Sequence, residues 1–278
     1  MASFDFDQAE GLRRMLAGPR PRIVSVLSAA AADDKNAVLV NLAASLVRTG
    51  SDVVLFDACQ GGRGVSARMD MPQAVTLLEV ARHEKPAAQV VQPTQEGFGL
   101  AMLSRGPVRT MPTEPLQVRR MNHGFGAIAR GTDIVIIDAE LGADDGFPLA
   151  AMESGEIVVQ VSPGAASIKD AYAIVKRLNA RLGRRSYGIL VTGAGEDEAR
   201  KVFDNMAQAA RRYLAVQLNW LGSVPADEHV KRAARLGRTV VDAFPLAGAS
   251  VAFRQLAGRF GAANDGTPAP RGARVAGM

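Results

Sequence analysis

Short aliphatic runs alternate with amphipathic, helix-like patterns along almost the whole chain. This alternation is typical of βαβ units, which build a mainly parallel sheet with helices on both faces. The runs Ile23–Leu27 and Ile134–Ile137 contain one polar residue between them, as expected of strands buried on both faces. We therefore predict a doubly wound α/β fold. The predicted strands are Ile23–Leu27, Val53–Phe56, Leu100–Leu103, Ile134–Ile137, Ile157–Val161, Ile189–Val191 and Leu218–Val224. The predicted helices are Lys35–Val47, Pro115–Arg130, Ser167–Leu182, Glu196–Tyr213, Asp227–Leu236 and Ala249–Phe260.

The pattern divides the chain into an arm, a body and a tail. Residues 1–20 hold a helix-sized segment and then a linker rich in proline and glycine, and residues 21–261 hold the whole alternating pattern. Residues 262–278 are small, polar and rich in proline and glycine, which predicts a disordered tail.

Composition narrows the classes of protein to be considered. With 278 residues, 47% of them hydrophobic, the body can bury a large core. The single cysteine, Cys59, excludes an internal disulfide and a metal site with two thiolates, and with three scattered histidines no metal centre is expected. No secretory signal or membrane-spanning run is visible, which predicts a cytoplasmic protein, with peripheral attachment at the inner face of the cell membrane or at a cell pole as the alternative.

Many of the basic residues behind the net charge of +5 lie in pairs on the predicted helices, such as Lys176–Arg177 and Arg211–Arg212. Solvated helix faces explain such pairs best, and no specific nucleic acid is expected as a partner. An acidic protein or lipid remains the alternative.

Candidate chemistry begins in the loop after the first strand. Ser28–Asp34 (SAAAADD) has the place of a phosphate-binding loop, with Lys35 and Asn36 at the start of the following helix. Such a loop uses glycines so that backbone N–H groups converge on a phosphate, and alanine resists that geometry. Asn36 stands where a hydroxyl would bind Mg²⁺. The segment predicts a degraded nucleotide site, with a plain strand-to-helix turn as the alternative.

Two acidic residues close predicted strands. Asp57 follows Val53–Phe56 and Asp138 follows Ile134–Ile137. Parallel sheets bind ligands at the carboxyl ends of their strands, and an aspartate at such an end can hold Mg²⁺. A helix or turn cap is the alternative role.

Taken together, these residues resemble the MinD/ParA-type deviant P-loop ATPases, and among them the flagellar-number regulators of the FlhG (FleN, YlxH) type. The loop and helix read SAAAADDKNAVLVNLA, the second strand end reads DACQGG, and later segments read IVIIDAELG, SPGAASIKDAYAIVK and LGSVPADEHVKRA. The resemblance covers nearly residues 7–260 and implies a MinD-like P-loop fold in a bacterial, cytoplasmic protein.

Departures from the family pattern fall on the residues that would handle ATP. The family's signature lysine, its Mg²⁺-binding threonine, an aspartate after the second strand and an adenine-contacting asparagine fall at Ala30, Asn36, Cys59 and Thr192. Lys35, Asp57 and Asp138 survive. We therefore expect a pseudo-ATPase with no cofactor. Weak binding of Mg-ATP through Lys35 is the alternative.

The arm carries a second resemblance. Residues 7–13 read DQAEGLR and match the family's DQAxxLR element, which activates the signal-recognition-type GTPase FlhF. By this resemblance Asp7, Gln8, Leu12 and Arg13 bind the partner, and Gln8 acts in trans at its GTP site. A loosely packed amphipathic helix is the alternative.

The last predicted helix has two interpretations. Phe253, Leu256 and Phe260 can share one face, and in MinD-like proteins such a helix binds membrane. A closing helix packed on the sheet is favoured, because the segment is short and rich in alanine.

The resemblance implies a regulator of flagellar number or placement that acts through an FlhF-type GTPase. A flagellar transcription regulator and a basal-body protein are further expected partners. The alternatives are an active MinD-like ATPase that cycles on and off the membrane, and a polar-localisation scaffold like the atypical MinD-like proteins of pilus assembly.

Overall fold

The computed structural model describes residues 21–59, 62–71, 74–105 and 114–262. Eight strands form one sheet in the order β3-β4-β2-β5-β1-β6-β7-β8, and every pair is parallel except β3 with β4. The strands are β1 Arg22–Ser28, β2 Val53–Asp57, β3 Gln92–Pro93, β4 Gly99–Met102, β5 Ile134–Asp138, β6 Glu156–Val161, β7 Tyr187–Thr192 and β8 Leu218–Val224. All seven predicted strands are confirmed.

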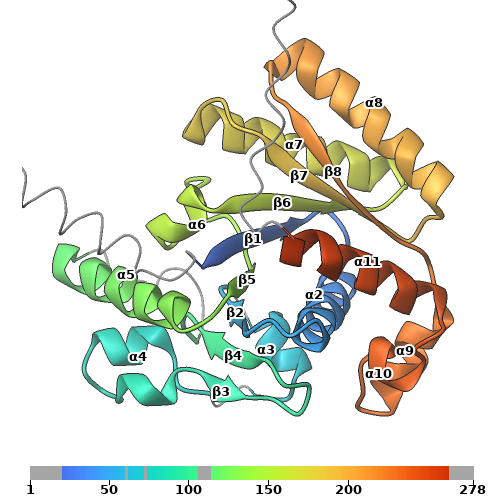
Figure 1. Ribbon diagram of the computed structural model, residues 1–278. Coiled ribbons are helices and arrows are strands. Elements are labelled where there is room, and N and C mark those ends of the chain that lie inside the picture. Colours follow the sequence, from blue (N-terminus) through green and yellow to red (C-terminus); the bar gives the residue numbers. More distant parts are fainter. Residues whose placement is uncertain (1–20, 60–61, 72–73, 106–113, 263–278) are drawn as a thin grey trace, which may run out of the picture.

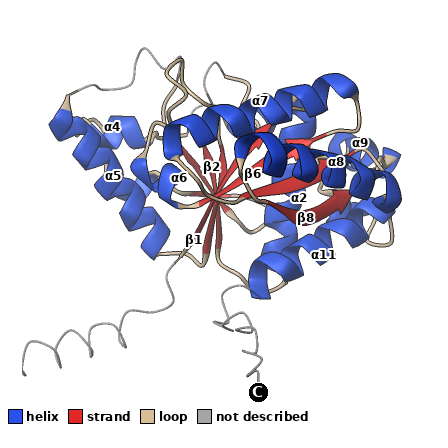
Figure 2. Cartoon of the chain, turned by 90° about the horizontal axis from the view of Figure 1, so that it is seen from above, coloured by secondary structure: helices blue, strands red, loops and turns tan. Residues whose placement is uncertain are grey.

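Helices cover both faces of the sheet (Figures 1 and 2). The six predicted helices are present as α2 Ala32–Arg48, α5 Pro115–Arg130, α7 Ala165–Leu182, α8 Glu196–Leu214, α9 Glu228–Arg235 and α11 Gly248–Ala262. Short elements add to them: α3 Val65–Arg68, α4 Leu77–Ala81, the 3-10 turn η1 Ala87–Gln89, α6 Ala150–Ser154 and α10 Val240–Ala243.

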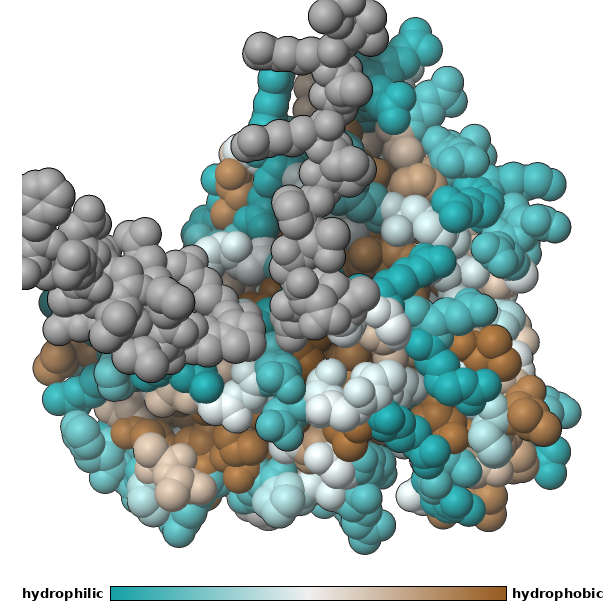
Figure 3. All heavy atoms as spheres, viewed as in Figure 1, coloured by the Kyte–Doolittle hydropathy of each residue, from teal (hydrophilic) through white to brown (hydrophobic). Residues whose placement is uncertain are grey.

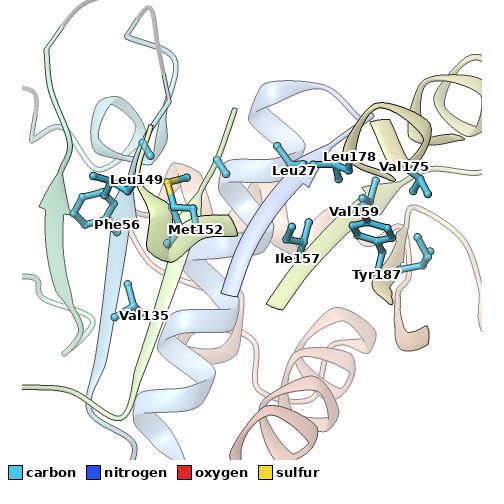
Figure 4. Close-up of a cluster of buried hydrophobic side chains, with 14 of the residues drawn as sticks. Leu27, Phe56, Val135, Leu149, Met152, Ile157, Val159, Val175, Leu178 and Tyr187 are labelled. Carbon is cyan, nitrogen blue, oxygen red and sulfur yellow. The ribbon is translucent and has the colours of Figure 1, made fainter. Parts of the chain in front are cut away.

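Alternate strand residues feed two separate cores. Val135 and Ile137 of β5 join the cluster under α4, α5, α7 and α8, whereas Ile134 and Ile136 join the cluster under α2, α10 and α11. Figure 4 shows part of the first cluster, in which Phe56, Met152 and Tyr187 are fully buried. This period-2 division explains why the strands read as unbroken aliphatic runs.

One predicted boundary is wrong. Ser28–Asp34 was expected to be loop, but α2 begins at Ala32, with Ala31 in the extended N-cap position. Alanine has the highest helix propensity, so the alanine run extends the helix backwards into the loop. The connection from β1 to α2 is therefore only three residues long.

Candidate functional site

The fold brings three of the four predicted nucleotide-site residues together at the carboxyl ends of the central strands. Asp57 and Asp138 lie opposite each other at the ends of β2 and β5. Lys35 lies at the end of the first turn of α2, the helix that follows β1, and β1 also pairs with β5. The side chains of Lys35 and Asp138 are 6% and 0% exposed. The cluster is thus interior to the protein.

The ammonium group of Lys35 is held by contacts within this cluster. Its Nζ lies 2.5 Å from Asp138 Oδ1, donates to the Ala139 carbonyl at 3.1 Å and lies 3.3 Å from Cys59 Sγ. An ammonium group has three protons to donate. Two of the three contacts are hydrogen bonds and the third is an ion pair, so the ammonium group is engaged inside the chain.

Asp57 is fixed by the segment that follows its strand. One carboxylate oxygen accepts the N–H of Cys59 at 3.0 Å, and the other accepts both the N–H and the hydroxyl of Ser66. A side chain at Gly64 would overlap the Asp57 carboxylate, so only glycine fits at that position. Asp138 accepts the N–H of Val65 through its second oxygen at 2.9 Å. The start of α3 is therefore anchored to both aspartates.

Burial and neighbouring charges set the protonation of the cluster. Burial alone would lower the pKa of Lys35, but the Asp138 carboxylate and Cys59 reverse this, and the net pKa is raised. Burial and the charge of Asp138 raise the pKa of Asp57, against the hydrogen bonds from Ser66. Burial and Asp138 also raise the pKa of the Cys59 thiol. The stable arrangement is a charged lysine beside a neutral thiol.

The loop offers few backbone donors to an anion. The N–H groups of Ala29 and Ala30 donate to Gln160 O and Ser28 Oγ, at 2.9 and 3.0 Å. Those of Asp34 and Lys35 both donate to Ala31 O at 3.1 Å. None of the described non-glycine residues of this loop has a positive φ. Four N–H groups of this segment are therefore already bonded within the chain.

Asn36, the fourth predicted residue, faces the same region but bonds elsewhere. Its Nδ2 donates to the Arg63 carbonyl at 2.9 Å, while its buried Oδ1 has no hydrogen-bond partner. That oxygen is one spare acceptor, whereas Lys35 and the N–H groups of Ala29, Ala30 and Asp34 are engaged within the chain. As arranged, Lys35 does not fit a Mg-nucleotide, because its ammonium group contacts Asp138, Ala139 and Cys59.

The carboxylates of Asp57 and Asp138 and the thiol of Cys59 place ligand atoms within 4.8 Å of one another. Lys35 contacts two of these three residues. The positive charge beside Asp138 is thus a side chain of the protein itself. Sequence reasoning named Cys59 as the single cysteine and as a departure from the family, but gave it no contact in the site. It missed Gly64, Ser66 and the Ala139 carbonyl, for which the Gly-x-Ser spacing after the second strand was the available signal.

The last helix is packed rather than surface-exposed on its apolar face. Phe253, Leu256 and Phe260 are 1%, 2% and 4% exposed, and α11 packs on α2 and β8. This burial agrees with the closing-helix interpretation, and the three side chains are not available to a membrane in this arrangement. Among the described residues, no helix is long and apolar enough to cross a membrane. The arm residues Asp7, Gln8, Leu12 and Arg13, like the predicted tail, lie outside the described residues.

The fold is that of MinD-like P-loop proteins. MinD in the MinC:MinD cell division complex of Aquifex aeolicus superposes with a TM-score of 0.65 at 18% identity, over 90% of this chain and 98% of that one. The Mg-ADP complex of the septum site-determining protein MinD from Pyrococcus horikoshii superposes with a TM-score of 0.61 at 18% identity, over 86% and 96% of the two chains. No family model matches the chain.

Sequence similarity points to the same group. The chain is 28% identical over 237 residues to the antiactivator FleN of Pseudomonas aeruginosa, and the match covers 85% of both chains. In both fold and sequence, this chain is similar to proteins of the MinD/ParA-type P-loop superfamily.

Proposed function

We propose that this chain is a regulator of flagellar number or placement in which an inactive, internally neutralised ATPase site holds the fold. The observation that carries the proposal is the ion pair between Lys35 and Asp138, with both partners buried. Similarity to the antiactivator FleN supports the regulatory class.

Nucleotide binding would have to break this arrangement. Lys35 would leave Asp138 to reach a phosphate, and removing one partner of a buried ion pair costs about 3–5 kcal/mol. The N–H groups of Asp34 and Lys35 would also have to leave the Ala31 carbonyl before they could donate to a phosphate. The interactions of a bound phosphate would have to offset the free energy of both changes. We therefore propose that ATP neither binds appreciably nor drives dimerisation.

Calorimetry and mass measurement with Mg-ATP test this part. The wild-type chain is compared with Lys35→Met/Asp138→Asn, which removes both charges of the pair while keeping its volume. We expect no binding heat and an unchanged mass for both proteins. A monomer-to-dimer shift in the wild type that the double variant lacks would overturn the pseudo-ATPase assignment.

The partner role is assigned to the arm. By the resemblance of residues 7–13 to DQAxxLR, the arm stimulates an FlhF-type GTPase, with Leu12 in the contact and Gln8 at the GTP site. A flagellar transcription regulator or a basal-body protein is a further proposed partner of the body. The proposed location is the cytoplasm, with recruitment to the cell membrane or pole by partners.

GTP hydrolysis by the cognate FlhF-type GTPase, measured with the full chain added, tests the arm. Gln8→Ala should remove stimulation with little loss of binding, because its proposed role is in the transition state. Leu12→Asp should abolish binding, since it places a charge on the contact. Equal rates with wild type and Gln8→Ala would reject the role of Gln8. No stimulation by the wild-type chain at saturation would reject the activator role and favour a localisation scaffold.

A nucleotide-binding, membrane-cycling ATPase is the second candidate. It is favoured by the Mg-ADP complex of the P. horikoshii MinD and by the unpartnered Oδ1 of Asn36 beside the loop. ATP turnover that rises on anionic vesicles would support this candidate over the first.

A further inference from the structure

A shallow groove of about 420 Å³ lies on the face of the sheet away from α11. Its walls are α4 with η1 on one side and the second half of α5 on the other, and Val54 and Leu77 form part of its floor. All of its lining residues are aliphatic or glycine. Figure 3 shows hydrophobic surface gathered at the lower left, the region that α4 and α5 occupy in Figure 1. Such a surface favours an apolar occupant.

The groove is built into the packing of two helices. Gly124 lets α5 approach α4 closely, because a Cβ there would lie 2.8 Å from Leu77 Cδ1. Ala127 is exposed and Ile128 half-buried on the wall that follows. By contrast, a cavity of about 520 Å³ beside α2 and α9 is lined by Arg68, Asp70 and Arg238, which suits a polar occupant.

We propose that the chain's own N-terminal segment, residues 1–20, docks its apolar side chains in this groove. The described chain begins at Pro21, beside one end of the groove. Arg22 pairs with Ile134 of β5, and its N–H donates to the Asp133 carbonyl at 2.9 Å. Gly131, two residues before Asp133, lines the groove.

Length and composition suit the segment to this site. Twenty extended residues span at most about 66–72 Å, which is ample for the segment to reach the groove from Pro21. Leu12 and Leu16 are four residues apart in the sequence and, with Phe4 and Phe6, give the segment an apolar content that the groove can cover. Tethering also gives the segment an effective concentration in the millimolar range, which an untethered partner must exceed.

Charge adds to the match. The first half of the segment carries Asp5, Asp7 and Glu10 and no basic residue. The exposed Lys85 and Arg130 flank the two walls of the groove in sequence. Opposite charges at the rim give orientation more than affinity.

This docking goes beyond the proposed function and supplies a way in which binding of a partner by the arm could be regulated. Leu12 cannot contact the groove and a partner at once, so release of the segment would be the regulated step. Docking is a property of the isolated chain, and its test therefore needs no GTPase and can fail or succeed independently of the activator role.

Limited trypsin digestion of the full chain tests the docking. Trypsin cuts after Arg13 and Arg14, whereas Arg20 precedes Pro21 and resists it. Ala127→Arg fills the groove, and Ala173→Arg, on the exposed face of α7, is the matched control. Cleavage after Arg271 and Arg274 provides an internal clock.

We expect Ala127→Arg and Leu12→Asp each to speed cleavage after Arg13 by about tenfold relative to that clock, with Ala173→Arg unchanged, because proteolysis follows the population of the released state. Equal rates in all four proteins would overturn the proposal. Protection that disappears on tenfold dilution would also overturn it, since the occupant would then be a second copy of the chain.

Discussion

Two acidic sites at the same edge of the sheet are built in opposite ways. After β2 and β5, Asp57 and Asp138 are buried and share their surroundings with the ammonium group of Lys35. After β8, Asp227 lies near the surface, accepts the N–H groups of His229 and Ala249 at 2.9 and 3.0 Å, and so joins the starts of α9 and α11.

This difference distinguishes the candidate site at Asp57 and Asp138 from the helix N-cap at Asp227. Asp227 does the ordinary work of a helix N-cap, which stabilises a protein by about 1 kcal/mol. A buried ion pair adds little net stability over apolar residues of the same volume, yet it is costly to break. A strand-end aspartate therefore indicates former ligand chemistry only where a buried counter-charge accompanies it.

The largest expected effect comes from breaking the buried pair. Lys35→Ala leaves Asp138 buried and unpaired, and we expect the free energy of unfolding to fall by about 3–5 kcal/mol. Urea denaturation measures this, with Lys169→Ala on the exposed side of α7 as the control. Lys35→Met/Asp138→Asn should lose much less. A single and a double variant of equal stability would refute the idea that the pair acts as a unit.

A smaller effect is expected at the cap. Asp227→Ala removes the acceptor for two backbone N–H groups, and we expect a loss of about 1–2 kcal/mol by the same measurement. Asp204→Ala, on an exposed position of α8, is the control and should stay within about 0.5 kcal/mol of wild type. A loss at Asp227 as large as that at Lys35 would erase the distinction drawn here.

The smallest effects are expected in the dependence of stability on pH, where the two sites act at opposite ends. The pKa of Lys35 is raised on folding, so its contribution is complete below about 10.4 and is lost as the pH rises through the folded value. At Asp227 burial alone would raise the pKa, but hydrogen bonds from Ala249 and His229 outweigh burial and the net pKa is lowered. The contribution of Asp227 to stability is therefore present above about pH 3.9 and is lost as the pH falls through the folded value.

Chemical denaturation across the pH range separates these contributions. Lys35→Met/Asp138→Asn should flatten the alkaline loss of stability, and Asp227→Ala should flatten the acid loss and leave the alkaline limb alone. A flattened alkaline limb in Asp227→Ala would mean that the sites are coupled.

The sequence predicted the framework well because the strands are buried on both faces and read as aliphatic runs. It missed β3, which is two residues long and contains Pro93, and the helices α3, α4, α6 and α10, which are too short to display a period. The comparison with phosphate-binding loops predicted a loop up to Asp34. Instead α2 begins at Ala32, because alanine has a high helix propensity.

The sequence predicted which residues form the candidate site better than it predicted how those residues contact one another. Strand ends place Asp57 and Asp138 side by side in any parallel sheet of this order, so their meeting followed from topology. That Lys35 turns inward to Asp138 depends on the side-chain packing of α2 against β5, which no periodicity encodes. The role of Gly64 was equally hidden, since it depends on how closely the chain passes the Asp57 carboxylate.

The central place of β1 has a consequence for how the chain is made. This strand is synthesised first among the eight, yet its two neighbours, β5 and β6, lie more than a hundred residues later. In an emerging chain both edges of β1 are therefore unpaired until β5 has been made, and one edge stays unpaired until residue 161 has left the ribosome. Contacts of such sequence separation slow folding and expose strand edges on the way. Truncations that end before β6 should consequently aggregate, whereas those that remove only β8 still leave β1 with both of its neighbours.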